Sequence, residues 1–293
     1  MNTAARVGAF GAGLAVVFGA ALGTGRLAGP WEQAGATAPH AEMAADNHGA
    51  MTAEPAGLSA TDQGYRLVPG AATITPSTSA RVTFRVLDAD GQALTAYTTA
   101  HEKKLHLIVV RRDLSGFQHV HPTMAADGTW SASLDLSRPG QWRMFADFDP
   151  EGPTGGLVLG TDLAVPGDYA PTPVPAPDTT TTAGPFTLRA TGGLDPHRAQ
   201  TVAFTIGRTD GRPTALQPYL GAGGHLVVLR EGDLVYAHAH PVTGTTAVGG
   251  GAQALAFRVE APGPGRYRMF LDFKSGNTVH TAAFTADAGG TTP

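Results

Sequence analysis

The sequence has 293 residues, enough for two domains with their own cores, and its 15% charged residues and abundant glycine and proline argue against long helices and coiled coils. The net charge of −4, without runs of lysine or arginine, excludes nucleic acid as an expected partner. Because cysteine is absent, disulfides and thiolate ligands are excluded, and a metal site would need histidine, methionine, carboxylate or backbone donors.

The first predicted element is an uncharged, apolar stretch from Val7 to Gly25, flanked by Arg6 and Arg26. Such a stretch is long enough to cross the hydrocarbon core of a bilayer as a helix. A basic flank followed by an apolar core with small residues also fits an export signal. We therefore expect residues 1–26 to be a signal peptide or a membrane anchor. Either outcome places the remainder of the chain outside the cytoplasm, secreted or held at the membrane. If the segment is not cleaved, the membrane is a binding partner of the protein.

Residues 27–61 are rich in alanine, glycine, threonine and proline and lack an apolar period, which predicts a disordered tether. Two histidines in it, His40 and His48, each precede a methionine by three residues, at Met43 and Met51. Imidazole and thioether together suit copper better than magnesium or calcium. Coincidence in a short polar tract is the alternative.

The rest of the chain contains a tandem repeat. Three segments recur in the same order: His106–Arg111 as His225–Arg230, His119–Pro122 as His238–Pro241, and Trp142–Phe148 as Tyr267–Phe273. In each copy the histidine that opens the second segment follows the histidine that opens the first by 13 positions. Conserved spacing within one chain indicates two related modules. We place these at residues 62–167 and 184–287, joined by a linker rich in proline and threonine at 168–183.

Each module has the pattern of short β-strands. Apolar and polar residues alternate through 82–86 and through the equivalent 202–206, and turn-forming pairs such as Asp90-Gly91 and Asp210-Gly211 separate such segments. About seven short strands per hundred residues are typical of a two-sheet sandwich. The predicted fold class is therefore all-β: two tandem immunoglobulin-like or cupredoxin-like β-sandwich modules after an N-terminal hydrophobic helix.

The first His-x-His-Pro motif predicts a trio of histidines on one β-hairpin. If the strands pair with His106 opposite His121, their side chains lie about 5 Å apart on one face. His119 shares that face, because residues i and i+2 of a strand point the same way. Three imidazoles are a known way to hold zinc or copper with one further position open. A register shift of one residue would separate His106 from the pair.

The same spacing in the second module predicts a second trio, formed by His225, His238 and His240. The alternative for both trios is structural, because His-x-His-Pro can close a strand with the imidazoles bonded to loop carbonyls. Recurrence of the spacing favours metal binding, although a shared packing requirement would leave the same pattern.

Four further residues are candidate metal ligands. Asp147 and Asp272 each lie between two phenylalanines, where a carboxylate binds metal, orients a ligand histidine or satisfies loop amides. His101 precedes the first trio and aligns with Leu220, whereas His280 lies on the last predicted strand of the second module. The fourth ligand is therefore expected to differ between the modules.

The chain resembles a family of exported bacterial envelope proteins, often described as heavy-metal-associated, with tandem His-x-His-Pro β-modules. The resemblance rests on 101–106, 117–122 and 142–148 in the first copy and on 219–284 in the second, and covers nearly everything beyond residue 62. It implies a secreted or anchored β-sandwich protein acting near copper or another heavy metal, and it implies no reaction.

We therefore expect an extracytoplasmic protein that binds copper or zinc, with copper favoured, and that captures or transfers the ion. Binding requires neutral imidazole, so affinity should fall as the pH drops through about 6.5. The alternative is a non-catalytic immunoglobulin-like adhesion or scaffold protein whose histidines only pack. An enzyme is disfavoured, because the sequence has no nucleophile elbow, phosphate loop or dinucleotide motif, and Glu102 near His106 is the only obvious base.

Overall fold

The computed structural model describes residues 56–289, with the backbone alone at 243–246. Within this range the chain is built of β-strands, and its one helical element is the 3-10 turn Gly249–Gly251. The expected signal or anchor and the histidine–methionine pairs of the tether lie outside the described residues. In the described part, no helix is long and apolar enough to cross a membrane.

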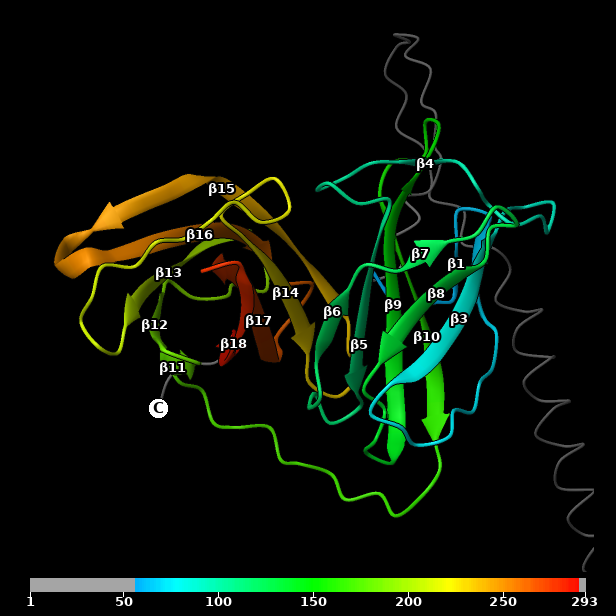
Figure 1. Cartoon of the computed structure of the whole chain (residues 1–293), viewed down its shortest axis with the longest axis horizontal. Helices are drawn as coiled ribbons and strands as arrows, with labels where there is room; N and C mark the ends of the chain where they lie inside the picture. Colours follow the sequence, from blue (N-terminus) through cyan, green and yellow to red (C-terminus); the bar gives the residue numbers. More distant parts are fainter. Residues whose placement is uncertain (1–55, 290–293) are drawn as a thin grey trace, which may run out of the picture. The chain divides into compact units, whose positions relative to one another are not determined.

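The first module is a sandwich of two sheets (Figure 1). Its outer sheet has the strand order β1 (Thr61–Asp62), β2 (Tyr65–Pro69), β3 (Ala80–Leu87), β8 (Trp130–Leu134) and β7 (Thr123–Met124). Its inner sheet has the order β10 (Leu157–Val165), β9 (Gly140–Pro150), β5 (Leu105–Arg111) and β6 (Gln118–Val120), and β4 (Tyr97–Thr98) pairs with β9. Alternate residues of β3 are buried, as the apolar period predicts, and Phe84 and Trp130 stack between the sheets.

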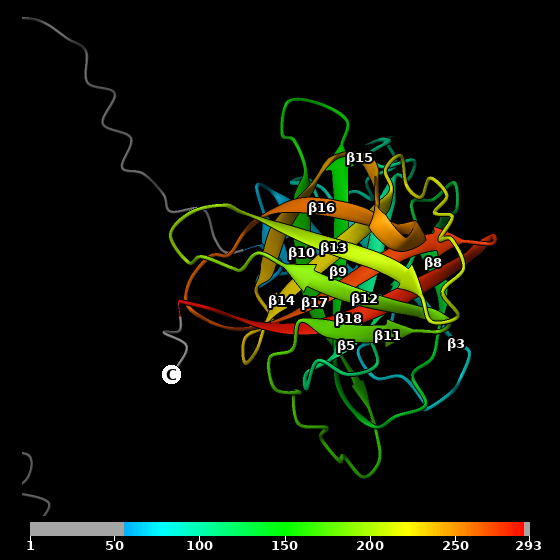
Figure 2. The same cartoon turned by 90° about the vertical axis from the view of Figure 1, so that its left-hand side faces the viewer.

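The second module is one eight-stranded sheet that folds over its own core. The strand order is β11 (Thr180–Ala183), β12 (Phe186–Thr191), β13 (Gln200–Arg208), β16 (Ala252–Glu260), β15 (Tyr236–Val248), β14 (Gly224–Arg230), β17 (Gly265–Ser275) and β18 (Thr278–Ala288). Figure 2 shows β16, β13, β12 and β11 side by side in one layer. The strand β15 belongs to both layers, because its start pairs with β14 and the rest pairs with β16.

The predicted all-β fold with two tandem β-modules is confirmed. Two boundaries differ from the prediction. The strand β11 lies inside the expected linker, and the packed chain begins before residue 62, because Gly57 N donates to Val158 O and Gly160 N donates to Ser59 O. Gly57 has a φ of +76°, and a Cβ there would lie 2.6 Å from the Phe145 ring, so only glycine fits.

The two modules belong to one compact unit. Besides the core of each module they share one apolar cluster, which we call the seam. Six of its buried side chains come from equivalent positions of the two repeats: Ile108 and Val227, Val110 and Leu229, Phe145 and Phe270. Leu114, Leu234, Val158 and Tyr236 complete the cluster. The strand β5 is buried at all seven positions, because one face packs on the core of its module and the other packs on the seam. A strand buried on both faces has an uninterrupted apolar run in place of alternation.

Both hairpins keep the predicted register, but the chain leaves the inner sheet at different points. In the first module β6 stays beside β5, with His119 opposite Ile108. In the second module pairing with β14 ends at Val228 opposite Ala237, and His238 already lies opposite Glu260 of β16. The histidines of the second His-x-His-Pro motif are thereby carried to another sheet.

Truncation of a seam side chain tests the coupling of the modules. Phe270 is 3% exposed and stacks on Phe117 with ring centroids 4.0 Å apart. Phe270→Ala should lower the free energy of unfolding by about 3–5 kcal/mol, because it leaves a cavity in the seam. Denaturant unfolding measures this change, and the exposed residue Val279 provides a control, Val279→Ala, expected to have an effect below about 0.5 kcal/mol. Equal effects of the two substitutions would contradict a packed seam.

Candidate functional site

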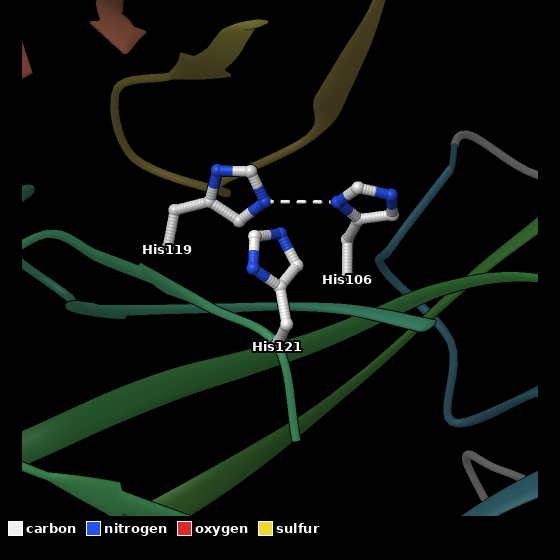
Figure 3. Close-up of side chains that lie close together, drawn as sticks. All are labelled: His106, His119 and His121. Atoms are coloured by element: carbon white, nitrogen blue, oxygen red, sulfur yellow. Dashed lines mark hydrogen bonds between the residues drawn. The ribbon is translucent and has the colours of Figure 1, made fainter. Parts of the chain in front are cut away.

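Three histidines of the first module converge as predicted (Figure 3). One ring nitrogen from each of His106, His119 and His121 lies within 4.8 Å of the others. His106 comes from β5 and His119 from β6, and His121 follows directly after β6. The side chain of His119 is 1% exposed and residue His106 is 3% exposed, whereas His121 is half-buried. Among the described residues this cluster is the one group of histidines and carboxylates with this geometry.

Hydrogen bonds on the outer side of the cluster set the tautomers of two rings. Nε2 of His106 lies 3.3 Å from the carbonyl oxygen of Ala100, which only accepts, so this nitrogen carries the proton. Nδ1 of His119 lies 2.8 Å from Oδ2 of Asp272 and donates to that carboxylate. In the neutral rings the remaining nitrogens, His106 Nδ1 and His119 Nε2, are therefore both lone pairs, and they face one another at 3.0 Å.

Two facing lone pairs need a positive group between them. A metal ion supplies it, and nitrogens bound at about 2.0 Å in a tetrahedral site lie about 3.3 Å apart, close to the spacing seen here. A proton also supplies it if His119 is an imidazolium paired with Asp272. Nε2 of His121 is buried and has no hydrogen-bond partner in the described part of the chain, so a third donor remains free. The donor set fits a transition-metal ion that prefers imidazole, such as zinc or copper, and does not suit magnesium or calcium.

The second module contributes to this site across the seam. Asp272 lies on β17, accepts from Thr281 Oγ1 as well as from His119, and its side chain is 3% exposed. A carboxylate that accepts from the outer nitrogen of a histidine orients that ring and raises its basicity toward a metal. The equivalent residue of the first module, Asp147, lies opposite His106 and accepts at 3.5 Å from the hydroxyl of Tyr236 in the second module. Each of the two carboxylates therefore receives a bond from the other module.

Burial shifts the pKa values of this cluster strongly. Desolvation and the neighbouring imidazoles lower the pKa of His106 to about 3, and desolvation chiefly lowers that of His121 to about 4 and that of His225 well below its ordinary value. Burial raises the pKa of Asp147 to about 6, against the opposing effect of His119. The rings of His106, His121 and His225 are therefore neutral at pH 7, which is the form that binds metal. The expected loss of affinity near pH 6.5 therefore moves to lower pH for His106 and His121.

The predicted second trio is wrong. His238 and His240 lie on β15 opposite Glu260 and Arg258, and their rings are parallel at 6.4 Å. His225 is instead found beside the first trio, with its ring centroid 5.2 Å from that of His106. The physical reason is the early crossing of β15 to β16, a long-range pairing that the local register does not reveal.

The remaining candidates have different positions. His101 is exposed, on a turn beside the trio, and its ring centroid lies 6.1 Å from that of His106. Both His101 and its counterpart Leu220 have positive φ values, 49° and 56°, which supports their alignment. His280 is not part of the cluster, because its ring packs between Phe186 and Phe273.

The module contacts at the site were missed by the sequence analysis, which assigned His225 and Asp272 to a second site and gave Tyr236 no role. One signal was available. The runs 107–110 and 226–229 are apolar without alternation, which indicates burial on both faces and hence a further packing partner.

Comparison of the sequence with protein families gives two matches to a domain of unknown function, DUF8832, at residues 60–155 and 180–290. The chain belongs to the DUF8832 family. One match falls on each module, in agreement with the internal repeat. No curated protein matches the sequence.

Several solved structures are similar to this chain at low identity. The Escherichia coli adhesin FdeC is 15% identical, over 78% of this chain and 65% of that chain, with a TM-score of 0.25. A marsupial T cell receptor is 12% identical, over 76% of this chain and 98% of the receptor chain, with a TM-score of 0.22. Invasin, a bacterial integrin-binding protein, is 16% identical, over 76% of this chain and 39% of the invasin chain, with a TM-score of 0.20. The chain thus spans less than two thirds of the adhesin and invasin chains.

The depressed histidine pKa values predict a stability that depends on pH. Below about 6.5 the unfolded chain protonates His106, His121 and His225, while the folded state does not, so acid favours unfolding. Each such histidine lowers the free energy of unfolding by roughly 1.4 kcal/mol for every unit by which the pH falls between the pKa of the unfolded chain and that of the folded protein. Asp147 has the opposite effect between about pH 4 and pH 6: its pKa is raised in the folded protein, so its protonation stabilises the fold as the pH falls. We expect the melting temperature of the metal-free protein to fall from pH 7 to pH 5.

Thermal unfolding at several pH values measures this slope. His225→Phe should flatten it, because one depressed histidine is removed and an aromatic ring is kept. His197→Ala is the control, since His197 is exposed in a turn, and it should leave the slope unchanged. A slope that is the same in both variants would show that buried neutral imidazoles are not its source.

Proposed function

We propose that this protein binds a transition-metal ion outside the cytoplasm, through His106, His119 and His121, and serves to capture or pass on that ion. The observation that carries the proposal is the pair of inward-facing lone pairs on His106 and His119, whose outer nitrogens are both committed as donors. The buried, unpartnered Nε2 of His121 adds a third donor. Zinc and copper are the candidate ions, because both accept imidazole readily.

Location outside the cytoplasm is supported by the uncharged stretch Val7–Gly25, which has the composition of an export signal or anchor. The histidine–methionine pairs of the tether would suit a donor that hands copper to a histidine site. Capture or transfer is favoured over catalysis, because His106 and the side chain of His119 are almost fully buried, which limits access of a substrate to them.

The second candidate function is that of an immunoglobulin-like adhesion or scaffold protein. The contact between His119 and Asp272 favours it, because an imidazolium paired with a carboxylate would join the modules without a metal. In that case His119 donates from Nε2 to His106 Nδ1, and the cluster is a polar clamp in the seam.

Metal titration distinguishes the two functions. Calorimetric titration of the full chain with Zn²⁺ and with Cu²⁺ should show one tight equivalent that depends on the trio. His121→Ala should weaken it by at least about 100-fold, because loss of a ligand exceeds the 10–100-fold cost of losing a residue that only supports one. The matched control is His240→Ala, the equivalent residue of the second module, which should bind like the wild type.

Binding by the tether is distinguished from binding by the trio with the double variant His40→Ala/His48→Ala. This variant should lose any weaker metal equivalents and keep the tight one. Absence of a tight equivalent, or a tight equivalent that survives His121→Ala, would rule out the trio as the binding site. The first of these results would favour the adhesion or scaffold function.

A further inference from the structure

A fourth imidazole lies against the trio, and it comes from the second module. The ring centroid of His225 is 4.7 Å from that of His119 and 5.2 Å from that of His106. The centroids within the trio are 5.0 to 5.3 Å apart. By centroid distance His225 is therefore as close to two of these rings as they are to one another, although only the trio already has one nitrogen from each ring within 4.8 Å of the others.

The fold holds His225 in this position. It lies on β14 opposite Asp272, the residue that orients His119, and two residues before Val227 of the seam. Its equivalent in the first module is His106 itself, so the two rings that stack at 20° are the same residue of the repeat. Packing of the seam thus brings an imidazole of each module to one point.

One ring nitrogen of His225 is not satisfied by the described part of the protein. Its Nδ1 is buried and lacks a hydrogen-bond partner among the described residues, as does Nε2 of His121. A buried polar nitrogen without a partner costs free energy, so two such atoms in one cluster need an explanation. The neighbouring side chains are imidazoles whose own protons are directed outward. A bound cation would satisfy both orphan nitrogens.

We propose that His225 is a fourth ligand of the ion held by His106, His119 and His121, so that the bound metal bridges the two modules. This proposal rests on the proposed function. The His225 ring now stacks on its neighbours and would turn from that orientation on binding. Four protein ligands leave no open position, which is the arrangement of structural and storage sites and not of catalytic ones. The ion is then held by both halves of the chain, and its release requires the seam to loosen.

The test uses the full chain, Zn²⁺ in competition with a chelator, and Co²⁺ as a spectroscopic probe of the ligand set. His225→Phe keeps an aromatic ring in the stack and removes the donor. It should lower Zn²⁺ affinity by at least about tenfold and change the Co²⁺ absorption spectrum, because one imidazole nitrogen is replaced by water. The matched control is His101→Phe, whose exposed ring lies 5.8 Å from that of His225 and should leave both measurements unchanged.

Hydrogen exchange supplies a readout that is independent of affinity. Zn²⁺ should slow exchange of amides in both β5 and β14 of the wild type, but only in β5 of His225→Phe, because the ion then touches one module. If the phenylalanine variant does not fold, His225→Gln serves in its place, with the same expected loss.

The outcomes separate the two proposals. If wild-type protein binds no tight metal equivalent, the proposed function and the bridge both fail. If the wild type binds through the trio and His225→Phe shows the same affinity and the same Co²⁺ spectrum, the trio binds alone and the bridge is wrong. If His101→Phe has the larger effect, the fourth ligand is His101 and the bridge is again wrong.

Discussion

The packing of one sheet face against its own repeated copy is the interaction on which the rest of the structure depends. The apolar residues of β5 and β14 meet in the seam, together with Phe145 and Phe270. This contact buries the polar end of each strand as well, where His106 and His225 lie opposite the two carboxylates. Buried polar groups require partners, and here each module supplies a donor to the buried carboxylate of the other.

The same constraint orients the candidate metal donors. His119 donates outward to Asp272, and His106 donates outward to Ala100, so both rings direct lone pairs inward. Neither bond by itself defines a site. Together they aim the lone pairs of two packed histidines at one point, with the free nitrogen of His121 beside them, and this is the arrangement on which the proposed metal site rests. The arrangement is thus an outcome of module docking, not of the His-x-His-Pro motif alone, since the second copy of that motif lacks it.

Local reasoning from the sequence reaches part of this result. The repeat, the strands and the hairpin register that brings His106, His119 and His121 together all follow from spacing and alternation, which are properties of neighbouring residues. The position of His238 cannot be predicted from local spacing. The point at which β15 leaves β14 depends on its pairing with β16, which comes later in the chain. The placement of His225 depends on which face of β14 meets the other module, and an apolar run shows burial without showing its partner.

A surface that recognises its own copy needs only one ancestral sequence to supply both sides, as at the two-fold axis of an isologous dimer. Here both copies are in one chain, so the contact forms at a high effective concentration and survives changes on either side. The halves are consequently free to diverge, and the two copies differ in this way: His119 and His121 lie beside the seam, whereas the early crossing of β15 places His238 and His240 beside β16.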